Sequence, residues 1–295
     1  LEHFSQHTLS LASVPEDELG NGYEFLIKKF ADDSGHTAQE FYTNRTVVHL
    51  MVQMLEPKPG EKIYDPTCGT GGMLISALDE VKRKGGEYRT LKLYGQERNH
   101  MTASIARMNL ALHGVDDFAI ARGDTLERPA FTDKDRLATY DMVLANPPYS
   151  IKQWNREAWT SDSWGRNFLG TPPQGRADYA FFQHILKSMD SKTGRCAILF
   201  PHGVLFRKEE ADMRQKLVDA EAAAQLEDAR FKYENASRLV ETGDIAKERF
   251  IELQKAVQAR QAALARSKFK DGFSDIIVET IRNVLEGKEP DYVSN

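Results

Sequence analysis

Short apolar runs alternate with amphipathic helical segments between residues 62 and 206, and this alternation constrains the fold more than any other feature of the chain. The runs read "KIYD", "LKLYGQE", "DFAIARGD", "YDMVLA" and "RCAILFPHGVLF". Helical patterns separate them, among others at residues 72–84, 100–114 and 177–189. Strands that alternate with helices predict an α/β fold with a mostly parallel, doubly wound sheet. Ligands of such sheets bind beyond the carboxyl ends of the strands.

The regions before and after this alternation have helical sequence patterns without strand-like runs. Residues 1–36 carry apolar side chains at helical spacing and predict a helical lead-in, the end of an N-terminal helical region. Residues 221–267 are rich in Ala, Glu, Lys and Gln and predict two helices joined by a turn at Gly243 and Asp244, and residues 274–287 predict a last helix. We therefore expect a main domain at 37–220 and a C-terminal helical region at 221–295, whose apolar stripe needs a partner.

Composition excludes several classes of protein. No apolar run approaches the roughly 20 residues that span a bilayer, and the N-terminal residues do not have the pattern of a signal peptide. Cys68 and Cys196 are too few for a disulfide framework or a zinc site, so we expect a cytoplasmic protein without a bound metal. The net charge of −5 argues against a chain that grips DNA by itself, because phosphate binding needs a basic surplus.

Polar side chains fall where four of the predicted strands end: Asp65, Glu97, Asp124 and Asn146. The first strand continues into the glycine-rich stretch "DPTCGTGGM", which permits close backbone approach and precedes a helix with free N–H groups. This stretch has neither the lysine of a P-loop nor the G-x-G-x-x-G spacing. By itself it also fits a plain strand-to-helix turn.

The acids after the second and third strands indicate what such a site can bind. Glu97 can accept hydrogen bonds from both hydroxyls of a ribose, and Asp124 can accept one from the amino group of an adenine ring. Each acid alone also fits a solvated cap or a turn. Jointly they describe a nucleoside site without a phosphate-binding lysine, which favours S-adenosylmethionine.

The stretch "NPPY" ends the fourth strand with two prolines that cannot continue it. The side-chain oxygen of Asn146 and the carbonyl of Pro147 can accept both hydrogens of an exocyclic amino group, and the prolines hold these acceptors rigidly. Tyr149 offers a ring on which an extruded base can stack. Transfer of an activated methyl group to such a nitrogen needs positioning more than a strong base. A proline turn that merely ends a strand is the alternative.

Together these motifs resemble the modification (methylase) subunits of type I restriction–modification systems. The resemblance covers roughly residues 17–210 and includes "EFYTNR" before an apolar helix, then "DPTCGTGGM", "GQE", "GDTL", "NPPY", "ADYAFF" and "GRCAILFPHGVLF" in this order. It implies an adenine-N6 DNA methyltransferase in which a Rossmann-like, S-adenosylmethionine-dependent catalytic domain occupies residues 37–220. It also implies that residues 221–295 include an arm that binds a partner.

The resemblance further implies two sets of site residues. The target adenine is held by Asn146, Pro147, Pro148 and Tyr149. The cofactor is held by Glu40, Phe41, Tyr42, Thr43, Asn44, Arg45, Asp65, Gly69, Thr70, Gly71, Gly72, Glu97 and Asp124. Two departures stand out: Asn44 replaces the usual proline, and helical texture follows "MRQKLVDA" where the family has a further pair of strands.

The implied partners are double-stranded DNA with the target adenine flipped out, a specificity subunit that carries two modification subunits, and a restriction subunit, with no membrane. Two alternatives remain open. One is a methyltransferase for another planar amino group, cytosine N4 or a protein glutamine. The other is a catalytically silent assembly subunit.

Other conspicuous side chains have simpler interpretations. Trp154, Trp159 and Trp164 follow the proline corner and either contact DNA or pack within their loop. His184 and His202 are expected to be core or surface residues rather than metal ligands.

Overall fold

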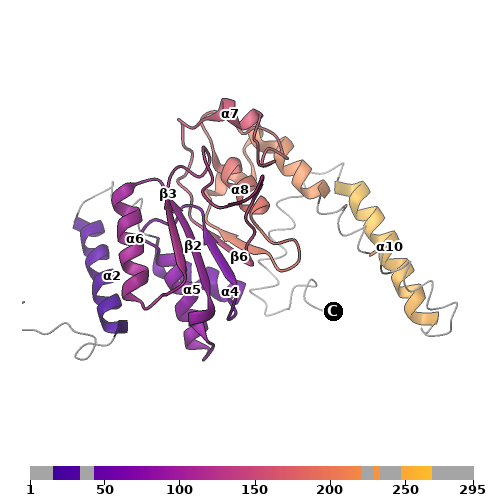
Figure 1. Ribbon diagram of the computed structural model, residues 1–295. Helices are drawn as coiled ribbons and strands as arrows, with labels where there is room; N and C mark the ends of the chain where they lie inside the picture. Colours follow the sequence, from indigo (N-terminus) through magenta and orange to yellow (C-terminus); the bar gives the residue numbers. More distant parts are fainter. Residues whose placement is uncertain are drawn as a thin grey trace, which may run out of the picture. The chain divides into compact units, whose positions relative to one another are not determined.

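The computed structural model describes residues 16–33, 43–220 and 247–267, together with the helical residues 223, 229, 230 and 232. The chain divides into two compact units, Leu1–Pro201 and His202–Asn295, and the central sheet belongs to the first (Figure 1). Within the described ranges, no helix combines the length and the apolar character needed to cross a membrane.

The central sheet has five strands in the order β3-β2-β1-β6-β7, all paired in parallel. They are β1 (Lys62–Asp65), β2 (Lys92–Glu97), β3 (Phe118–Arg122), β6 (Met142–Ala145) and β7 (Arg195–Ile198). The first strand lies in the middle, where Ile63 pairs with Leu93 of β2 on one side and with Met142 of β6 on the other. The chain builds outward from β1 in one direction and then in the other, which creates a topological switch point. This arrangement confirms the predicted α/β class with a parallel sheet.

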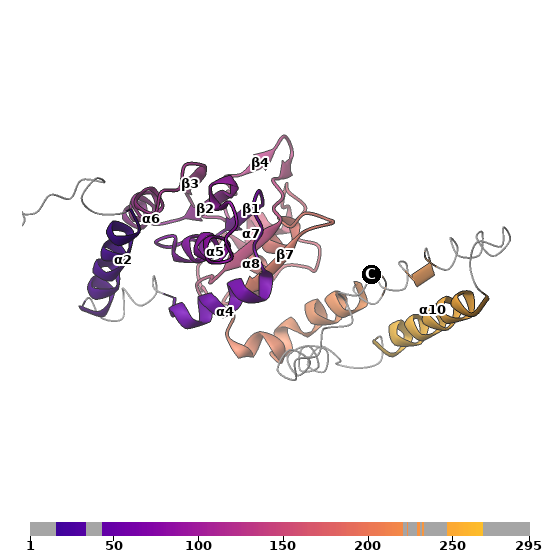
Figure 2. The same ribbon diagram turned by 90° about the horizontal axis from the view of Figure 1, so that it is seen from below.

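Helices cover both faces of the sheet. Helices α4 (Arg45–Leu55), α5 (Gly72–Arg83) and α6 (His100–Leu112) pack on one face, and α8 (Asp178–Lys187) packs on the other. The unit also contains α2 (Glu16–Asp33), the short helix α7 (Arg156–Thr160) and a 3-10 turn at Tyr88–Thr90. In both views α2 lies beside α6, and α6 in turn packs against β2 and β3 at one edge of the sheet (Figures 1 and 2).

Alternation along the strands divides the core between these two faces, because successive side chains of a strand point in opposite directions. Ile63 and Leu144 belong to the cluster that α4, α5 and α6 cover. Their neighbours Tyr64 and Val143 belong to a second cluster, which includes Ile185 of α8. Both clusters are buried, which explains why the strands read as continuous apolar runs.

Two details of the chain between residues 130 and 206 differ from what the sequence predicts. The strand predicted over 195–206 ends at Ile198, and a 3-10 turn at His202–Leu205 follows it. A hairpin of two very short strands, β4 (Thr132–Asp133) and β5 (Arg136–Leu137), precedes β6 and was not predicted. Strands of this length carry too few side chains to show a period of two.

The second unit contains the 3-10 turns η2 (His202–Leu205) and η3 (Lys208–Glu210), helical residues 211–220 and the helix α10 (Lys247–Ser267). The predicted turn at Gly243 and Asp244 and the predicted helix at 274–287 lie outside the described residues. The domain limits at 36/37 and 220/221 stay predictions.

Candidate active site

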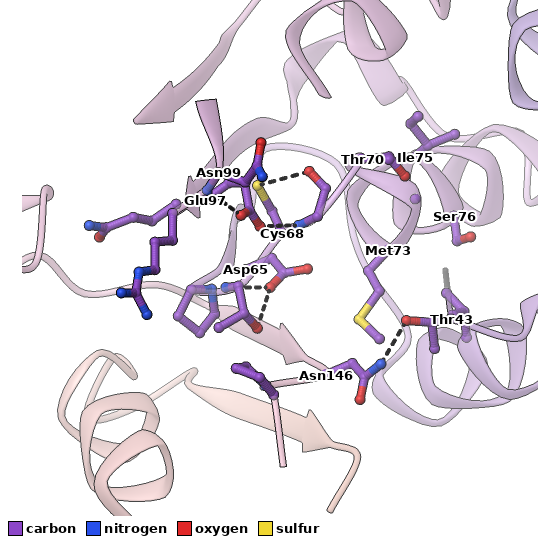
Figure 3. Close-up of a pocket in the computed structure, with 18 of the residues that line it drawn as sticks. Thr43, Asp65, Cys68, Thr70, Met73, Ile75, Ser76, Glu97, Asn99 and Asn146 are labelled. Atoms are coloured by element: carbon purple, nitrogen blue, oxygen red, sulfur yellow. Dashed lines mark hydrogen bonds between the residues drawn. The ribbon is translucent and has the colours of Figure 1, made fainter. Parts of the chain in front are cut away.

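A cavity of about 980 Å³ lies at the carboxyl ends of the strands, and polar side chains from four of these ends line it. Figure 3 labels Asp65, Glu97 and Asn146 among them. They are Asp65 at the end of β1, Glu97 at the end of β2, Asp124 after β3 and Asn146 after β6. The sheet topology brings them together because parallel strands end at one edge. The four residues picked out in the sequence thus share one cavity.

The glycine-rich turn after β1 is shaped by backbone requirements. Gly71 has φ of 84°, in the left-handed region that favours glycine, and caps α5 without a side chain. Gly95 of β2 gives the turn its room, since a β-carbon there would lie 2.8 Å from Sγ of Cys68. Cys68 also donates its backbone N–H to the carbonyl of Gln96 over 3.0 Å. Gly72 and Met73 at the start of α5 line the cavity, and the first N–H groups of a helix have no partner within the helix, so they suit an anionic group of a ligand.

Glu97 connects two loops at the edge of the cavity. Its Oε2 accepts the backbone N–H of Gly69 over 3.1 Å, and its Oε1 accepts that of Asn99 over 2.7 Å. The side chain of Asn99 in turn caps α6 by accepting the N–H groups of Met101 and Thr102. Each carboxylate oxygen has a second lone pair, so Glu97 can still accept a hydrogen bond from a ligand.

Asp65 is the most deeply buried of the three acids, with 2% of its surface exposed. Its Oδ1 accepts the backbone N–H of Thr67 over 2.9 Å, and its other oxygen points into the cavity (Figure 3). Burial raises the pKa of this carboxyl to about 7, the neighbouring charge of Glu97 adds to the effect, and the hydrogen bond from Thr67 opposes it. The charge of the cavity wall therefore changes near neutral pH.

Asp124 follows the left-handed Gly123 and closes a turn. Its Oδ1 accepts the backbone N–H of Leu126 over 2.9 Å. The guanidinium of Arg98 lies 3.6 Å from Oδ2 of Asp124, and both residues line the cavity. The sequence gives no signal for Arg98 beyond its place next to Glu97, and we did not predict it.

At the proline corner, hydrogen bonds join both ends of the Asn146 amide to hydroxyl groups. Its Nδ2 donates to Oγ1 of Thr43 over 3.0 Å (Figure 3), and its Oδ1 accepts from the hydroxyl of Tyr149 over 3.0 Å. Asn146 and Pro148 line the cavity, Pro147 is buried, and half of the surface of Tyr149 is exposed. The corner is therefore internally hydrogen-bonded and faces the cavity.

Asp178 supports this corner from α8. The residue after the corner, Ser150, is left-handed with φ of 51°, which is unusual for a residue with a side chain. Its backbone N–H donates to Oδ1 of the buried Asp178 over 2.9 Å. The carboxylate also lies in the first turn of α8, where the helix dipole favours negative charge. We did not predict Asp178, although it belongs to the "ADYAFF" motif.

The other predicted site residues fall into three groups. Those that line the cavity are Thr43, Arg45, Gly69, Thr70 and Gly72. The second group does not line the cavity and consists of Asn44, Gly71, Pro147 and Tyr149. Asn44 instead caps α4, because its side chain accepts the N–H of Thr46. Glu40, Phe41 and Tyr42 lie outside the described residues. Apolar walls that we did not predict come from Met73, Ile151 and Phe181.

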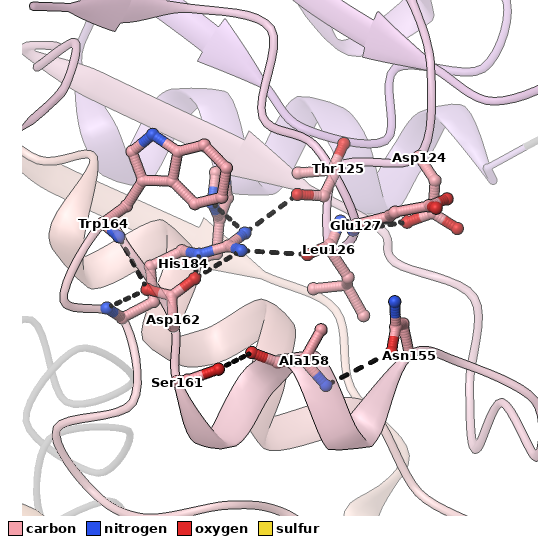
Figure 4. Close-up of polar contacts among 11 residues, drawn as sticks. Asp124, Thr125, Leu126, Glu127, Asn155, Ala158, Ser161, Asp162, Trp164 and His184 are labelled. Carbon is pink, nitrogen blue, oxygen red and sulfur yellow. Dashed lines mark hydrogen bonds and ion pairs between the residues drawn. The ribbon is translucent and has the colours of Figure 1, made fainter. Parts of the chain in front are cut away.

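A buried arginine fastens the loop after the corner to the segment after β3. The Arg166 side chain is 2% exposed, forms an ion pair of 2.7 Å with Asp162, and donates to the carbonyls of Thr125 and Leu126 over 2.9 Å each (Figure 4). Its guanidinium also lies over the ring of Trp159, 4.5 Å from the ring centre. Arg166 thus links this loop to the turn that contains Asp124.

These contacts also decide two of the simpler interpretations. Trp159 is 2% exposed and packs against Leu126 and Phe181, so its ring is not available to DNA. Trp154 and Trp164 are half-buried, and their interpretation stays a prediction. His184 is a core residue: one ring nitrogen lies 3.1 Å from the hydroxyl of Tyr64, and burial together with the charge of Arg166 lowers its pKa well below the usual value. Among the described residues, no cluster of three or more His, Cys, Asp or Glu side chains is placed to bind a metal.

Comparison with known proteins gives a consistent set of relatives. Residues 14–226 match a family model described as N-6 DNA Methylase. The type I restriction enzyme HindI methylase subunit of Haemophilus influenzae is 32% identical over 225 residues, which cover 74% of this chain and 49% of that protein. The type I restriction enzyme MjaVII methylase subunit of Methanocaldococcus jannaschii is 33% identical over 72% of this chain and 36% of its own length.

A solved structure agrees with these relatives. The type I restriction-modification system methyltransferase subunit from Streptococcus thermophilus has a TM-score of 0.63 and 36% identity, over 71% of this chain and 44% of that one. The chain spans about half the length, or less, of the relatives it matches.

Proposed function

The chain belongs to the N-6 DNA methylase family, and from this membership we propose that it transfers a methyl group from S-adenosylmethionine to N6 of adenine in DNA. We further propose that it does so as the modification subunit of a type I restriction–modification complex. One observation carries the proposal: the Asn146 corner shares a single cavity with the carboxylates of Asp65, Glu97 and Asp124. An acceptor for an amino group and carboxylates that can accept hydrogen bonds from a nucleoside therefore line the same cavity.

The residues that line the cavity fit S-adenosylmethionine chemically. Glu97 and Asp124 each offer a carboxylate oxygen, suited to ribose hydroxyls and to the adenine amino group respectively. The carboxylate of Asp65 suits a cationic group of S-adenosylmethionine, and the backbone N–H groups at the start of α5 suit the carboxylate of the cofactor. A volume of about 980 Å³ lies within the range of ligand sites and leaves room for a nucleobase as well. When bound, S-adenosylmethionine supplies a methyl group activated by its sulfonium.

The proline corner acts on the target nitrogen. An adenine amino group is a poor nucleophile because its lone pair is delocalised into the ring. The side-chain oxygen of Asn146 and the carbonyl of Pro147 accept its two N–H hydrogens, which draws the nitrogen toward tetrahedral geometry and frees the lone pair. Pro147 and Pro148 keep both acceptors in place, so little reorganisation is needed when the base arrives. Tyr149 stacks on the extruded base.

The charge of the chain supports a division of labour with partners. A net charge of −5 gives little non-specific grip on DNA, so we propose that a specificity subunit reads the sequence and holds two copies of this chain. The helical C-terminal region, which includes α10, supplies the contact with that subunit, and a restriction subunit completes the complex.

Methylation of plasmid DNA with tritium-labelled S-adenosylmethionine tests the proposal, with and without the cognate specificity subunit. Nucleoside analysis is expected to find the label in N6-methyladenine, and the specificity subunit is expected to increase transfer strongly. Label in N4-methylcytosine or in protein glutamine would assign the site to another amino group. No calorimetric signal with S-adenosylmethionine would indicate a silent assembly subunit.

A further inference from the structure

The amide of Asn146 must present its oxygen, and not its nitrogen, to the target base. We propose that Thr43 is a positioning residue that holds the amide in this orientation by accepting the hydrogen bond from Nδ2. The inference rests on the proposed function, because it assigns a role to Thr43 in the same site. The proposed role of Thr43 is to orient the side chain of Asn146, and not to bind the cofactor.

The two ends of an asparagine side chain are nearly identical in shape and opposite in function. The oxygen accepts hydrogen bonds, whereas the NH2 group donates two. Rotation of the amide by a half turn about χ2 costs little by itself, because this torsion is broad and roughly two-fold. After such a rotation, Nδ2 of Asn146 would face the N–H groups of the target, donor against donor. A hydrogen-bond partner on the far side of the amide fixes its plane, and it accepts from Nδ2 when the oxygen faces the target.

Thr43 supplies this acceptor from a well-anchored position. It directly precedes Asn44, whose side chain caps α4 by accepting the N–H of Thr46 over 2.9 Å. Val48, one turn further along α4, is buried in the main core cluster. The branched side chain of threonine has few χ1 rotamers, so a fixed backbone also fixes its hydroxyl. Helix α4 thus places Oγ1 of Thr43 3.0 Å from Nδ2 of Asn146.

Tyr149 marks the other end of the same amide. Its hydroxyl donates to Oδ1 of Asn146 over 3.0 Å, so this oxygen already acts as the acceptor of the corner in the structure. An adenine amino group is a donor of the same kind and takes this place when the base enters. Thr43 lies on the nitrogen end of the amide and remains there throughout. Thr43 is therefore the permanent partner of Asn146, and Tyr149 is the one that the substrate replaces.

The family resemblance predicts a different role for Thr43, contact with the cofactor, and the two roles lead to different measurements. A residue that contacts the cofactor changes its affinity when the hydroxyl is removed. A residue that orients Asn146 leaves cofactor affinity almost unchanged. It weakens instead the recognition of the adenine amino group, in binding as well as in methyl transfer.

The test uses the full chain assembled with its specificity subunit, and the variants Thr43→Val and Thr43→Ser. Valine keeps the shape and removes the hydroxyl, whereas serine keeps the hydroxyl. Thr132→Val is a matched control on the exposed hairpin strand β4, away from the cavity. Three quantities are measured: the single-turnover rate of methylation, the Kd of S-adenosylmethionine, and the ratio of Kd values for DNA with purine or adenine at the target position.

We expect Thr43→Val to lower the methylation rate about three- to tenfold, as for the loss of one hydrogen bond, and to reduce the preference for adenine over purine by a similar factor. The Kd of S-adenosylmethionine is expected to stay within about twofold, Thr43→Ser to recover most of the loss, and Thr132→Val to match the wild type. In an Asn146→Ala background, Thr43→Val is expected to have no further effect, because the residue through which it acts is missing.

Two results would overturn the inference: an unchanged adenine preference in Thr43→Val, or an equal loss of rate with and without Asn146. A weaker Kd of S-adenosylmethionine with intact adenine preference would assign Thr43 to the cofactor. These outcomes are separate from failure of the proposed function, in which the wild-type complex itself transfers no methyl group to adenine. The binding ratio needs no methyl transfer, so it tests Thr43 even then.

Discussion

The hydroxyl of Tyr149 donates a hydrogen bond of 3.0 Å to the side-chain oxygen of Asn146. This oxygen is the acceptor that the proposed mechanism assigns to the target nitrogen, so the protein itself already uses it as an acceptor. Because the rigid prolines between the two residues fix their spacing, the corner is preorganised rather than assembled around the base.

Replacement of Asn146 by alanine tests the electrostatic part of the mechanism. Loss of one preorganised polar group is expected to cost about 2.7–4 kcal/mol in methyl transfer, a decrease of roughly 100- to 1000-fold in kcat. The Kd of S-adenosylmethionine is expected to change little, because the cofactor is assigned to other residues. Asn155→Ala is a suitable control, since Asn155 caps the short helix α7 and does not line the cavity. Unchanged turnover in Asn146→Ala would remove this residue from the mechanism.

Replacements of Tyr149 separate its ring from its hydroxyl. Tyr149→Ala removes the stacking platform, which is expected to weaken binding of DNA with an extruded target base by about 1–3 kcal/mol. Tyr149→Phe keeps the ring, so its effect on the same binding constant is expected to be much smaller. Fluorescence of 2-aminopurine at the target position reports extrusion of the base. An equal loss of DNA binding in Tyr149→Ala and Tyr149→Phe would show that the hydroxyl, and not the ring, contributes to binding of the extruded base.

Asp65 is expected to make cofactor binding depend on pH. Burial raises the pKa of this carboxyl from 3.8 to about 7, so it is mostly protonated at pH 6 and mostly ionised at pH 8. A cationic ligand favours the ionised form and releases a proton on binding. Affinity for S-adenosylmethionine is therefore expected to rise about tenfold between pH 6 and pH 8. Calorimetry in two buffers of different ionisation enthalpy measures both the affinity and the released proton.

The variant Asp65→Asn is the control for this pH dependence, because its amide does not titrate. The affinity of this variant for S-adenosylmethionine is expected to be low and nearly independent of pH between pH 6 and pH 8. A pH profile identical to that of the wild type would show that another group is responsible.

Arg166 is expected to matter for stability. Arg166→Met would leave the carboxylate of Asp162 buried without its partner, since 2% of each side chain is exposed, and is expected to lower the free energy of unfolding by about 3–5 kcal/mol. Arg83→Met is expected to have a far smaller effect, because the buried carboxylate of Glu80 keeps a second partner, Lys84, at 3.4 Å. Urea unfolding measures the free energy of unfolding of both variants. Similar losses in the two variants would contradict the assignment of Arg166 as a buried anchor.

The sheet and the four strand-end residues could be predicted because their signals are local. Buried parallel strands read as apolar runs, and the residue that ends each run is visible in the sequence. Once the class of sheet is known, Asp65, Glu97 and Asn146 must lie at one edge, whatever the details of packing. This is why the four polar residues at the strand ends could be predicted from the sequence, whereas Arg98 and the apolar walls of the cavity could not.

The contacts that tune the site could not be predicted, because they join segments far apart in the chain. The bond from Asn146 to Thr43 spans 103 positions, and that from Arg166 to the carbonyl of Thr125 spans 41. Such pairs depend on how α4 and the loop after the corner pack, and no periodicity encodes this packing. The short hairpin β4–β5 was missed for another reason, since strands of two residues leave no pattern.

The role of the proline corner is tested by a structure of the protein with DNA and a bound cofactor analogue, in which the distances from N6 of the target adenine to two protein atoms are measured. We expect N6 to lie within hydrogen-bonding distance of both the Asn146 side-chain oxygen and the Pro147 carbonyl, in the cavity that Asp65 and Glu97 line. A target base held elsewhere, with both oxygens turned to solvent, would contradict it.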